Sequence, residues 1–302
     1  MNSTTRAMVM MIGAMLALPG IDAIAKWLAG SISSGQVTMS RFLFQVLLML
    51  PLLIRIREPW QVSDLWLHAS RGFFIAMATL LFFTGLAWLP IADAIAIFFI
   101  EPMLVTLLSM VFLGESVGWR RISAIAIGFI GAMVIIRPTF AEVGWPALFP
   151  VGAAACFAFY IILTRKMAPG ENPVRLQFLG GLFALLVMVI ALLIGAAEDI
   201  PVLESVWPTP FQWFLLATLG VIGAGCHLLV VYAYGLAPVS ILAPFQYVEI
   251  IGATILGLVV FGDFPDLLTW FGVSIIVGSG IYIFHRESKL GHNSGVANEG
   301  AP

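Results

Sequence analysis

The main pattern along the chain is a series of long apolar stretches separated by short polar breaks. A helix needs about 20 mainly apolar residues to cross the roughly 30 Å hydrocarbon layer of a bilayer. Alternation of apolar and polar residues with a period of two, as in a β-barrel, is absent. The pattern therefore predicts an all-α integral membrane protein with ten transmembrane helices. These occupy residues 7–28, 36–54, 72–89, 93–113, 121–137, 146–164, 176–196, 211–234, 239–261 and 268–285.

Composition supports a membrane protein. Hydrophobic residues make up 61% of the chain and charged residues 10%, whereas a soluble domain is about half apolar and about a quarter charged. At roughly 300 residues a single soluble core already stops growing, so this much apolar surface needs a lipid bilayer as partner. The net charge of −2, without a clustered basic face, excludes a nucleic-acid partner.

The basic residues predict an orientation. With the N-terminus inside, eleven of the 14 Lys and Arg residues, Arg71 and Arg175 among them, fall in cytoplasmic segments. Since Lys and Arg favour cytoplasmic loops, we expect both termini there. The first span contains Asp22 and Lys26 and is expected to be a retained helix, not a cleaved signal peptide. The polar, non-periodic residues 288–302 are expected to form a disordered cytoplasmic tail.

The chain also repeats itself. The tripeptide Gly85-Leu86-Ala87 and its counterpart Gly235-Leu236-Ala237 each close one span before a short connection to the next. The two halves, residues 1–140 and 141–287, then contain five spans each. Because five is odd, the second half enters the membrane from the opposite side, and such inverted repeats hold a substrate site near the midplane in many carriers. Repetition alone does not establish function, however.

A second repeated motif leads to a family. Glu101-Pro102 precedes Leu113-Gly114-Glu115, and in the second half Pro244 and Glu249 precede Phe261-Gly262-Asp263. In order and duplication these motifs resemble the drug/metabolite transporter superfamily, in its ten-helix branch with two EamA-type repeats. The second repeat departs from the family pattern by having Asp263 for Glu and no Pro directly after Glu249. The resemblance implies a multi-pass carrier of the bacterial inner membrane, often an exporter, with a central cavity lined by both halves. The chain is similar in particular to bacterial aromatic-amino-acid exporters.

The function that follows is secondary transport of a small-molecule substrate by alternating access. We expect export of small metabolites, most plausibly amino acids, including aromatic ones. No nucleotide-binding motif is present, so we expect neither direct use of ATP nor a cofactor. The first alternative is a channel or receptor, although no filter loop or ring of pore charges is visible. The second is a membrane-embedded enzyme, but nucleophile-elbow, HExxH and phosphate-loop motifs are missing, so we expect no enzyme. The oligomeric state stays open, and a monomer is compatible with the pattern.

Two carboxylates within the spans are the first candidates for a site. A charged side chain at the bilayer centre costs roughly 2.5–3.5 kcal/mol or more. Glu101 and Glu249 each lie thirteen residues before a span-ending acidic motif, which is about 20 Å of helix. They are expected either to sense protons or a substrate ammonium in the cavity, or to be structural groups bonded to neighbouring backbones. Pro102, which frees a carbonyl beside Glu101, suits the structural alternative.

Three more charges lie in the first two spans. Asp22 and Lys26 are four residues apart and share a helix face, so mutual pairing is the favoured interpretation. The alternative is that they meet the two charges of a zwitterion at the outer end of a cavity. Arg41 is expected either to hold an anionic group or to extend toward the membrane interface.

Aromatic and polar side chains form a third set of candidates. His227 and Tyr234 are seven residues apart and lie on one helix face, and Gln246 and Tyr247 follow Pro244. Aromatic rings in a cavity would stack on an aromatic ligand or bind a cation, although ordinary helix packing explains any single one. His227 has no ligand neighbours at metal-binding spacing, so no metal site is expected. The remaining aromatic candidates are Phe98, Phe99 and Tyr160.

Prolines and small residues predict how the spans bend and pack. Pro19-Gly20, Pro102 and Pro244 are expected to interrupt spans as gating hinges or as static kinks. The small residues of Ala124-Gly128-Ala132 and of the segment from Gly272 to Gly280 predict close helix packing, within one protomer rather than between two.

Overall fold

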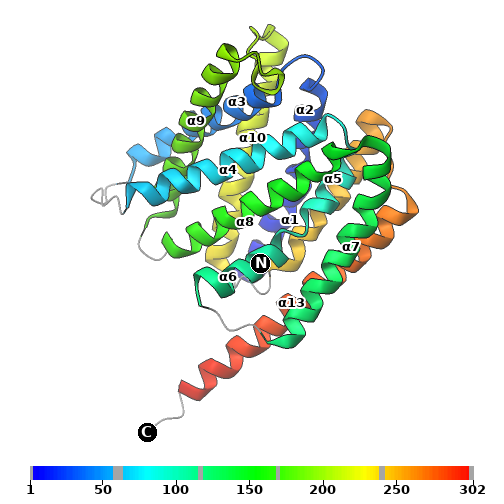
Figure 1. Ribbon diagram of the computed structural model, residues 1–302. Helices are drawn as coiled ribbons and strands as arrows, with labels where there is room; N and C mark the ends of the chain where they lie inside the picture. The colour runs from blue at the N-terminus through cyan, green and yellow to red at the C-terminus, as the bar shows by residue number, and fades with distance from the viewer. Residues whose placement is uncertain (1–2, 57–63, 115–117, 168–170, 238–241, 299–302) are drawn as a thin grey trace.

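The structure is a computed structural model that describes residues 3–56, 64–114, 118–167, 171–237 and 242–298. The side chains of Arg121, Val231, Tyr234, Ala243 and Pro244 and those beyond residue 282 lie outside this description. Within the described ranges the regular elements are helices, without strands (Figure 1). In chain order they are α1 (Ser3–Ala17), α2 (Pro19–Leu28), α3 (Ser34–Ile54), α4 (Leu65–Leu86), α5 (Ile91–Phe98), α6 (Glu101–Phe112), α7 (Trp119–Val143), η1 (Trp145–Leu148), α8 (Phe149–Met167), α9 (Pro173–Ala197), η3 (Pro201–Leu203), α10 (Pro210–Leu236), η4 (Ala243–Val248), α12 (Glu249–Leu256), η5 (Gly257–Phe261) and α13 (Leu267–Asn298).

Eight helical stretches in the described ranges are long and apolar enough to cross a membrane, and they coincide with the first eight predicted spans. Phe245–Phe261 and Leu267–Tyr282 are shorter apolar helices at the positions of the last two. The multi-pass, all-helical architecture is therefore confirmed, while the count of ten stays a prediction. The backbone of α13 continues past residue 288 to Asn298, and disorder of the tail stays a prediction.

Side-chain caps set several helix starts. Ser33 Oγ accepts a hydrogen bond from Gln36 N at 3.1 Å at the start of α3. At the start of α10, Thr209 and Gln212 form a capping box, in which each side chain accepts from the other residue's backbone N–H. Such caps satisfy N–H groups that have no partner within the helix.

One cap corrects a predicted helix start. Asp64 Oδ1 accepts from Trp66 N at 3.1 Å, so α4 begins at Leu65 rather than near residue 72. Arg71 therefore lies inside the helix and is 2% exposed. Arg175 is likewise buried in the first turns of α9. The sequence placed these two arginines in segments between spans, whereas both lie within helices. The side of the membrane on which they lie and the orientation of the termini stay predictions.

The helices pack in pairs that join the two halves of the chain. Helix α4 of the first half packs against α8 of the second, and α10 of the second half packs against α1 of the first in the corresponding way. Similarly, α4 packs on α9 as α10 packs on α3, and α6 packs on α8 as α12 packs on α1. Figure 1 shows α4 and α8 side by side in the middle of the bundle. This exchange of partners is the pattern expected for two halves related by a two-fold axis.

A separate pair of helices, α7 and α13, closes one edge of the bundle (Figure 1). Their backbones approach so closely that a Cβ atom added to Gly131 would stand 3.0 Å from the carbonyl oxygen of Gly272. A Cβ on Gly272 would stand 2.8 Å from the carbonyl oxygen of Gly131. The predicted close packing within one protomer is therefore present, centred on these two glycines.

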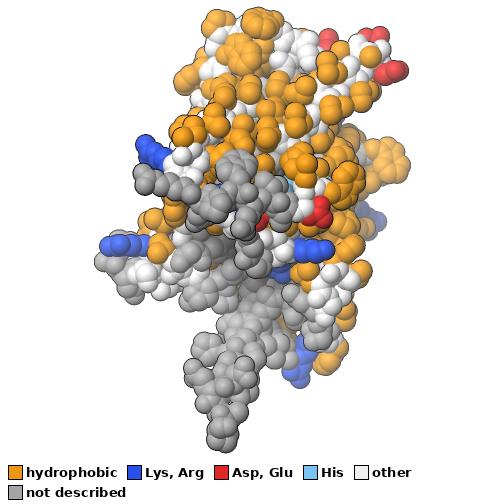
Figure 2. Space-filling view, turned by 90° about the vertical axis from the view of Figure 1, so that its left-hand side faces the viewer, with side chains coloured by type: hydrophobic (Ala, Val, Ile, Leu, Met, Phe, Trp, Pro, Cys, Tyr) orange, Lys and Arg blue, Asp and Glu red, His pale blue; other side chains and the backbone are white. Residues whose placement is uncertain are grey.

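The surface exposes far more apolar side chains than that of a soluble protein. Figure 2 shows a broad field of hydrophobic side chains over the upper part of one face. Leu193, Val259 and Leu267 are exposed by 68%, 75% and 86%. Soluble monomers rarely expose large continuous apolar patches, so this surface is suited to contact with lipid tails.

Three spans are broken in the described ranges: the first at Leu18, between α1 and α2, and two others beside a candidate glutamate. The fourth span divides into α5 and α6, with Glu101 as the first residue of α6 and Pro102 as the second. The segment at residues 243–261 divides into η4, α12 and η5, with Glu249 as the first residue of α12. Backbone that leaves regular helix at membrane depth is tolerated where it is buried or lines a cavity.

Candidate functional site

Two adjacent cavities lie where helices of both halves meet. The aromatic cavity has a volume of about 150 Å³, and the smaller arginine cavity about 10 Å³. Both are lined by Arg41 from α3, Ile75 from α4 and His227 from α10, so these three side chains form the boundary between them. The other lining residues of the arginine cavity are Phe42, Gln45, Arg71, Tyr160, Gln177, Gly180 and Gly181. Those of the aromatic cavity are Leu18, Ile21, Asp22, Ala78, Thr79, Phe82, Phe83, Ile95, Phe98, Phe157 and Glu249.

Arg71 is held in the arginine cavity by uncharged acceptors. Its Nε donates to Thr164 Oγ1 at 2.7 Å, and its Nη1 donates to the carbonyl oxygen of Leu176 at 2.6 Å. Its Nη2 donates to Tyr160 Oη at 2.8 Å and to Gln177 Oε1 at 3.4 Å. The guanidinium also lies 4.6 Å from the centre of the Tyr160 ring, within range of a cation–π contact. The result is a fixed positive charge among α4, α8 and α9.

Arg41 reaches the same cavity from α3. Its Nη1 donates to Thr79 Oγ1 at 2.7 Å, and Thr79 in turn donates to the carbonyl oxygen of Ile75 at 2.9 Å. Its Nη2 lies 3.3 Å from His227 Nε2. Because a guanidinium has only donors, this contact requires His227 Nε2 to accept. Arg41 Nε is buried without a hydrogen-bond partner in the described part of the chain.

The aromatic cavity combines acidic groups with aromatic rings. Asp22, which is 7% exposed, and Glu249 line it. Phe98 packs edge-to-face between Phe82 and Phe157, with ring centroids 5.4 Å and 5.6 Å apart. The cavity thus offers two carboxyl groups and an aromatic wall, with the guanidinium of Arg41 at its boundary.

The two candidate glutamates lie in different surroundings. Glu249 lines the aromatic cavity, whereas Glu101 is among the lining residues of neither cavity. The structure therefore brings only one of this sequence-related pair to the site, although each begins the helix after a break in its span.

The favoured pairing of Asp22 with Lys26 was wrong. Lys26 Nζ lies 2.7 Å from Asp263 Oδ2 and donates to the carbonyl oxygen of Leu89 at 2.9 Å. It also lies 5.0 Å from the ring centre of Phe261. Helical spacing permitted the Asp22 pair, but the fold brings a carboxylate from the second half to Lys26. Asp22 is thereby left to the cavity.

The remaining predicted residues divide into three groups. Tyr160 lines the arginine cavity. Phe99 packs edge-to-face on Tyr247 with centroids 5.2 Å apart, and neither these two nor Gln246 of η4 lines a cavity. The side chains of Tyr234 and Pro244 lie outside the described residues, so their predicted roles stay predictions.

Sequence reasoning missed several lining residues, Arg71 above all. The polar stretch before it hid the start of α4, although Asp64 ahead of apolar Leu65 and Trp66 is a recognisable N-cap signal. Phe82 and Phe157 carry no distinguishing signal, because phenylalanine is common in these spans. In the described part of the chain no group of three or more His, Cys, Asp or Glu side chains could hold a metal ion.

Comparison with known proteins agrees with this architecture. The model of the EamA-like transporter family matches the chain twice, over residues 5–137 and 144–284. The chain is 26% identical over 271 residues to an S-adenosylmethionine uptake transporter of Rickettsia bellii, covering 89% of each protein. It is 29% identical over 287 residues to a riboflavin transporter of Vibrio cholerae, covering 92% of this chain and 93% of the relative.

A solved crystal structure also resembles the fold. It is 19% identical to this chain, covers 91% of it and 95% of its own length, and has a TM-score of 0.59. At this identity the likeness concerns the fold alone.

Proposed function

Because the chain belongs to the EamA-like transporter family, we propose that it is a secondary carrier that moves an amino-acid-like metabolite by alternating access. In this proposal it is a multi-pass protein of a bacterial inner membrane. It has ten spans in two inverted repeats of five, with both termini cytoplasmic. Its family and relatives are transporters, not enzymes.

The observation that carries the proposal is the composition of the aromatic cavity. Asp22 and Glu249 suit an ammonium group, Arg41 suits an oxyanion, and Phe98 and its neighbours suit an aromatic ring. A few convergent polar groups in a largely apolar cavity are typical of small-molecule sites. The lining comes from both halves, as a site between two inverted repeats requires.

The named relatives narrow the choice of test substrates. S-adenosylmethionine carries a carboxylate, an ammonium group and a purine ring, and thus all three features that the cavity complements. Riboflavin has a large aromatic ring system without a charged group. Aromatic amino acids have the same three features as S-adenosylmethionine in smaller form. Export is the direction that the sequence resemblance implies, while the name of one relative specifies uptake.

Counterflow in proteoliposomes tests the proposal independently of direction. Vesicles that contain the purified protein are preloaded with each unlabelled compound, and exchange against external labelled compound is measured. The panel contains the amino acids, S-adenosylmethionine and riboflavin. We expect saturable exchange for at least one compound with a carboxylate, an ammonium group and a ring. No exchange across the panel, or flux that does not saturate as in a channel, contradicts the proposal.

A matched pair of variants tests the position of the site. Phe98→Ala removes a ring from the cavity wall and should weaken exchange, because stacking and buried ring area are lost. Phe271→Ala removes a ring that is 59% exposed on α13 and is not among the cavity-lining residues. Equal exchange by these two variants would place the substrate elsewhere.

A further inference from the structure

The arginine cavity contains positive charge in excess of what its surroundings neutralise. The ion pairs within the described ranges join Lys26 to Asp263 and His68 to Glu171. Neither Arg41 nor Arg71 has a carboxylate partner there. Asp22 of the adjoining cavity attracts Arg41 electrostatically, but neither Asp22 nor Glu249 forms an ion pair with Arg41 in the described ranges. We propose that Arg41 and Arg71 form a subsite for an oxyanion of the transported molecule, a carboxylate or a phosphate, an inference that rests on the proposed function.

The energetic argument concerns desolvation. A buried charge is costly unless it is paired and hydrogen-bonded. Arg71 is 2% exposed, and its four hydrogen bonds go to a threonine, a carbonyl, a tyrosine and a glutamine. These neutral acceptors fix its orientation but leave its charge in place. An anionic ligand group would supply the charge that the protein does not.

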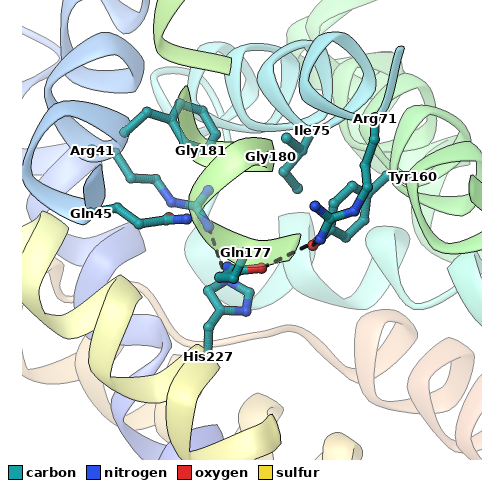
Figure 3. A pocket seen from close by; sticks show the side chains of 10 residues that line it. Arg41, Gln45, Arg71, Ile75, Tyr160, Gln177, Gly180, Gly181 and His227 are labelled. Carbon is teal, nitrogen blue, oxygen red and sulfur yellow. Dashed lines mark hydrogen bonds between the residues drawn. The ribbon is translucent and has the colours of Figure 1, made fainter. Parts of the chain in front are cut away.

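The cavity also has an unused donor. Arg41 Nε is buried without a hydrogen-bond partner among the described residues. Gln45, 3% exposed, lines the same cavity from one turn further along α3. Figure 3 shows the guanidinium groups of Arg41 and Arg71 on opposite sides of Gln177 and His227, both directed inward. Guanidinium donors match the geometry of carboxylate and phosphate oxygens.

Two adjacent glycines of α9 leave room for the side chains that line the arginine cavity. A Cβ atom on Gly180 would overlap Nη1 of Arg71. A Cβ on Gly181 would stand 3.0 Å from Nε2 of Gln45. Any other residue at these two positions would therefore occupy space next to the donors.

The shared boundary of the two cavities orients the ligand in this proposal. With its oxyanion between Arg41 and Arg71, a molecule extends past Ile75 and His227 into the aromatic cavity. Its ring then meets Phe98, and an ammonium group meets Asp22 or Glu249. The substrate class that follows is an aromatic metabolite with an oxyanion at one end.

Two pairs of probes test the subsite in the purified protein in detergent. Phenylpropionate and its neutral amide differ in one carboxylate, and riboflavin phosphate and riboflavin differ in one phosphate. A ligand that binds the folded state raises the unfolding temperature. We expect the charged member of at least one pair to raise it more than the neutral member, and the responding pair identifies the oxyanion.

Substitutions then locate the effect. Arg41→Gln and Arg71→Gln should each weaken binding of the charged member by roughly ten- to hundred-fold, as expected for the loss of charge-assisted hydrogen bonds. Arg41→Lys and Arg71→Lys keep the charge and should restore part of the binding, which also separates lost binding from lost folding. Arg55→Gln, at the exposed C-cap of the same helix as Arg41, should bind as the wild type does.

Two outcomes overturn the subsite: equal responses to charged and neutral members in the wild type, or unchanged discrimination in both glutamine variants. Counterflow reports separately on the proposed function. Exchange without charge discrimination contradicts the subsite but supports the carrier function. Charge-selective binding without exchange supports the anion site but contradicts the carrier function.

Discussion

Lys26 and Arg71 are both cations within the bundle, but the protein treats them differently. Lys26 has a carboxylate from the other half of the chain, Asp263, at 2.7 Å. Arg71 is surrounded by uncharged acceptors and lines the small arginine cavity. A cation that has its own counterion serves to join elements of the protein. A cation without one is available to a ligand.

Solvent exposure strengthens the contrast. The side chains of Lys26 and Asp263 are 17% and 33% exposed, so water shares in their solvation. Arg71 is 2% exposed and has less water to stabilise its charge. Substitutions at the two places should therefore have different signatures: loss of transport at the arginine cavity, and a small loss of stability at the lysine pair.

The largest effect is expected from reversal of charge at the boundary of the two cavities. Arg41→Glu replaces a cation by an anion where we place the substrate's oxyanion. It should lower kcat/KM of counterflow by about a hundred-fold or more, as both attraction and hydrogen bonds are lost. Arg55→Glu on the same helix is the control and should transport normally. Normal transport by Arg41→Glu would contradict the proposal that Arg41 binds the substrate and differs in this from the structural cation Lys26.

The second prediction concerns the open space beside Arg71. Gly180→Ala puts a methyl group where the guanidinium lies, so Arg71 must move and its hydrogen bonds must lengthen. We expect counterflow to fall by roughly ten-fold, since small displacements of positioning groups are costly. Gly225→Ala on α10 meets no atom within 4 Å and should leave counterflow unchanged. If both variants transport equally, the glycine is not needed for an open site.

The sequence predicts the architecture of this molecule better than its site. Hydrophobic length alone located the spans, because crossing a bilayer requires a fixed length of apolar helix. Glu101 and Glu249 were equivalent by sequence position, yet of the two only Glu249 lines the aromatic cavity, and neither lines the arginine cavity. Which side of a helix faces a cavity depends on packing against helices far away in the chain.

Charge pairing shows the same limit. Asp22 and Lys26 have ideal spacing for a pair within one helix, but Asp263 lies 237 residues beyond Lys26 and reaches it through the fold. Arg71 was assigned to a loop because polar residues precede it, and the cap at Asp64 places it inside α4. Local rules list the partners that are possible, and tertiary structure selects among them.

The third prediction extends the comparison to the carboxylates. Glu249→Gln removes a group that can exchange a proton inside the aromatic cavity, whereas Glu101→Gln does so outside it. We expect Glu249→Gln to lower counterflow a few-fold and to flatten its pH dependence, with little change in the profile of Glu101→Gln. The measurement is the initial rate of counterflow across a series of pH values, equal on both sides. Unchanged pH profiles in both variants would contradict proton coupling through either glutamate.

The smallest effect is expected at the lysine pair, and it is one of stability. Lys26→Met and Asp263→Asn each leave one partner without its counterpart. For a partly exposed pair, a double-mutant cycle should give a coupling free energy of about 1 kcal/mol or less. Unfolding of the single and double variants in detergent provides the cycle, and counterflow by Lys26→Met should remain within a few-fold of wild type. The exchanged pair, Lys26→Asp with Asp263→Lys, should recover part of the lost stability, because the two side chains still meet between the halves. Lys26→Met could instead lose as much counterflow as Arg41→Glu. In that case a cation with its own counterion would also act on the substrate, and exposure and ion pairing would not distinguish ligand-binding cations from structural ones.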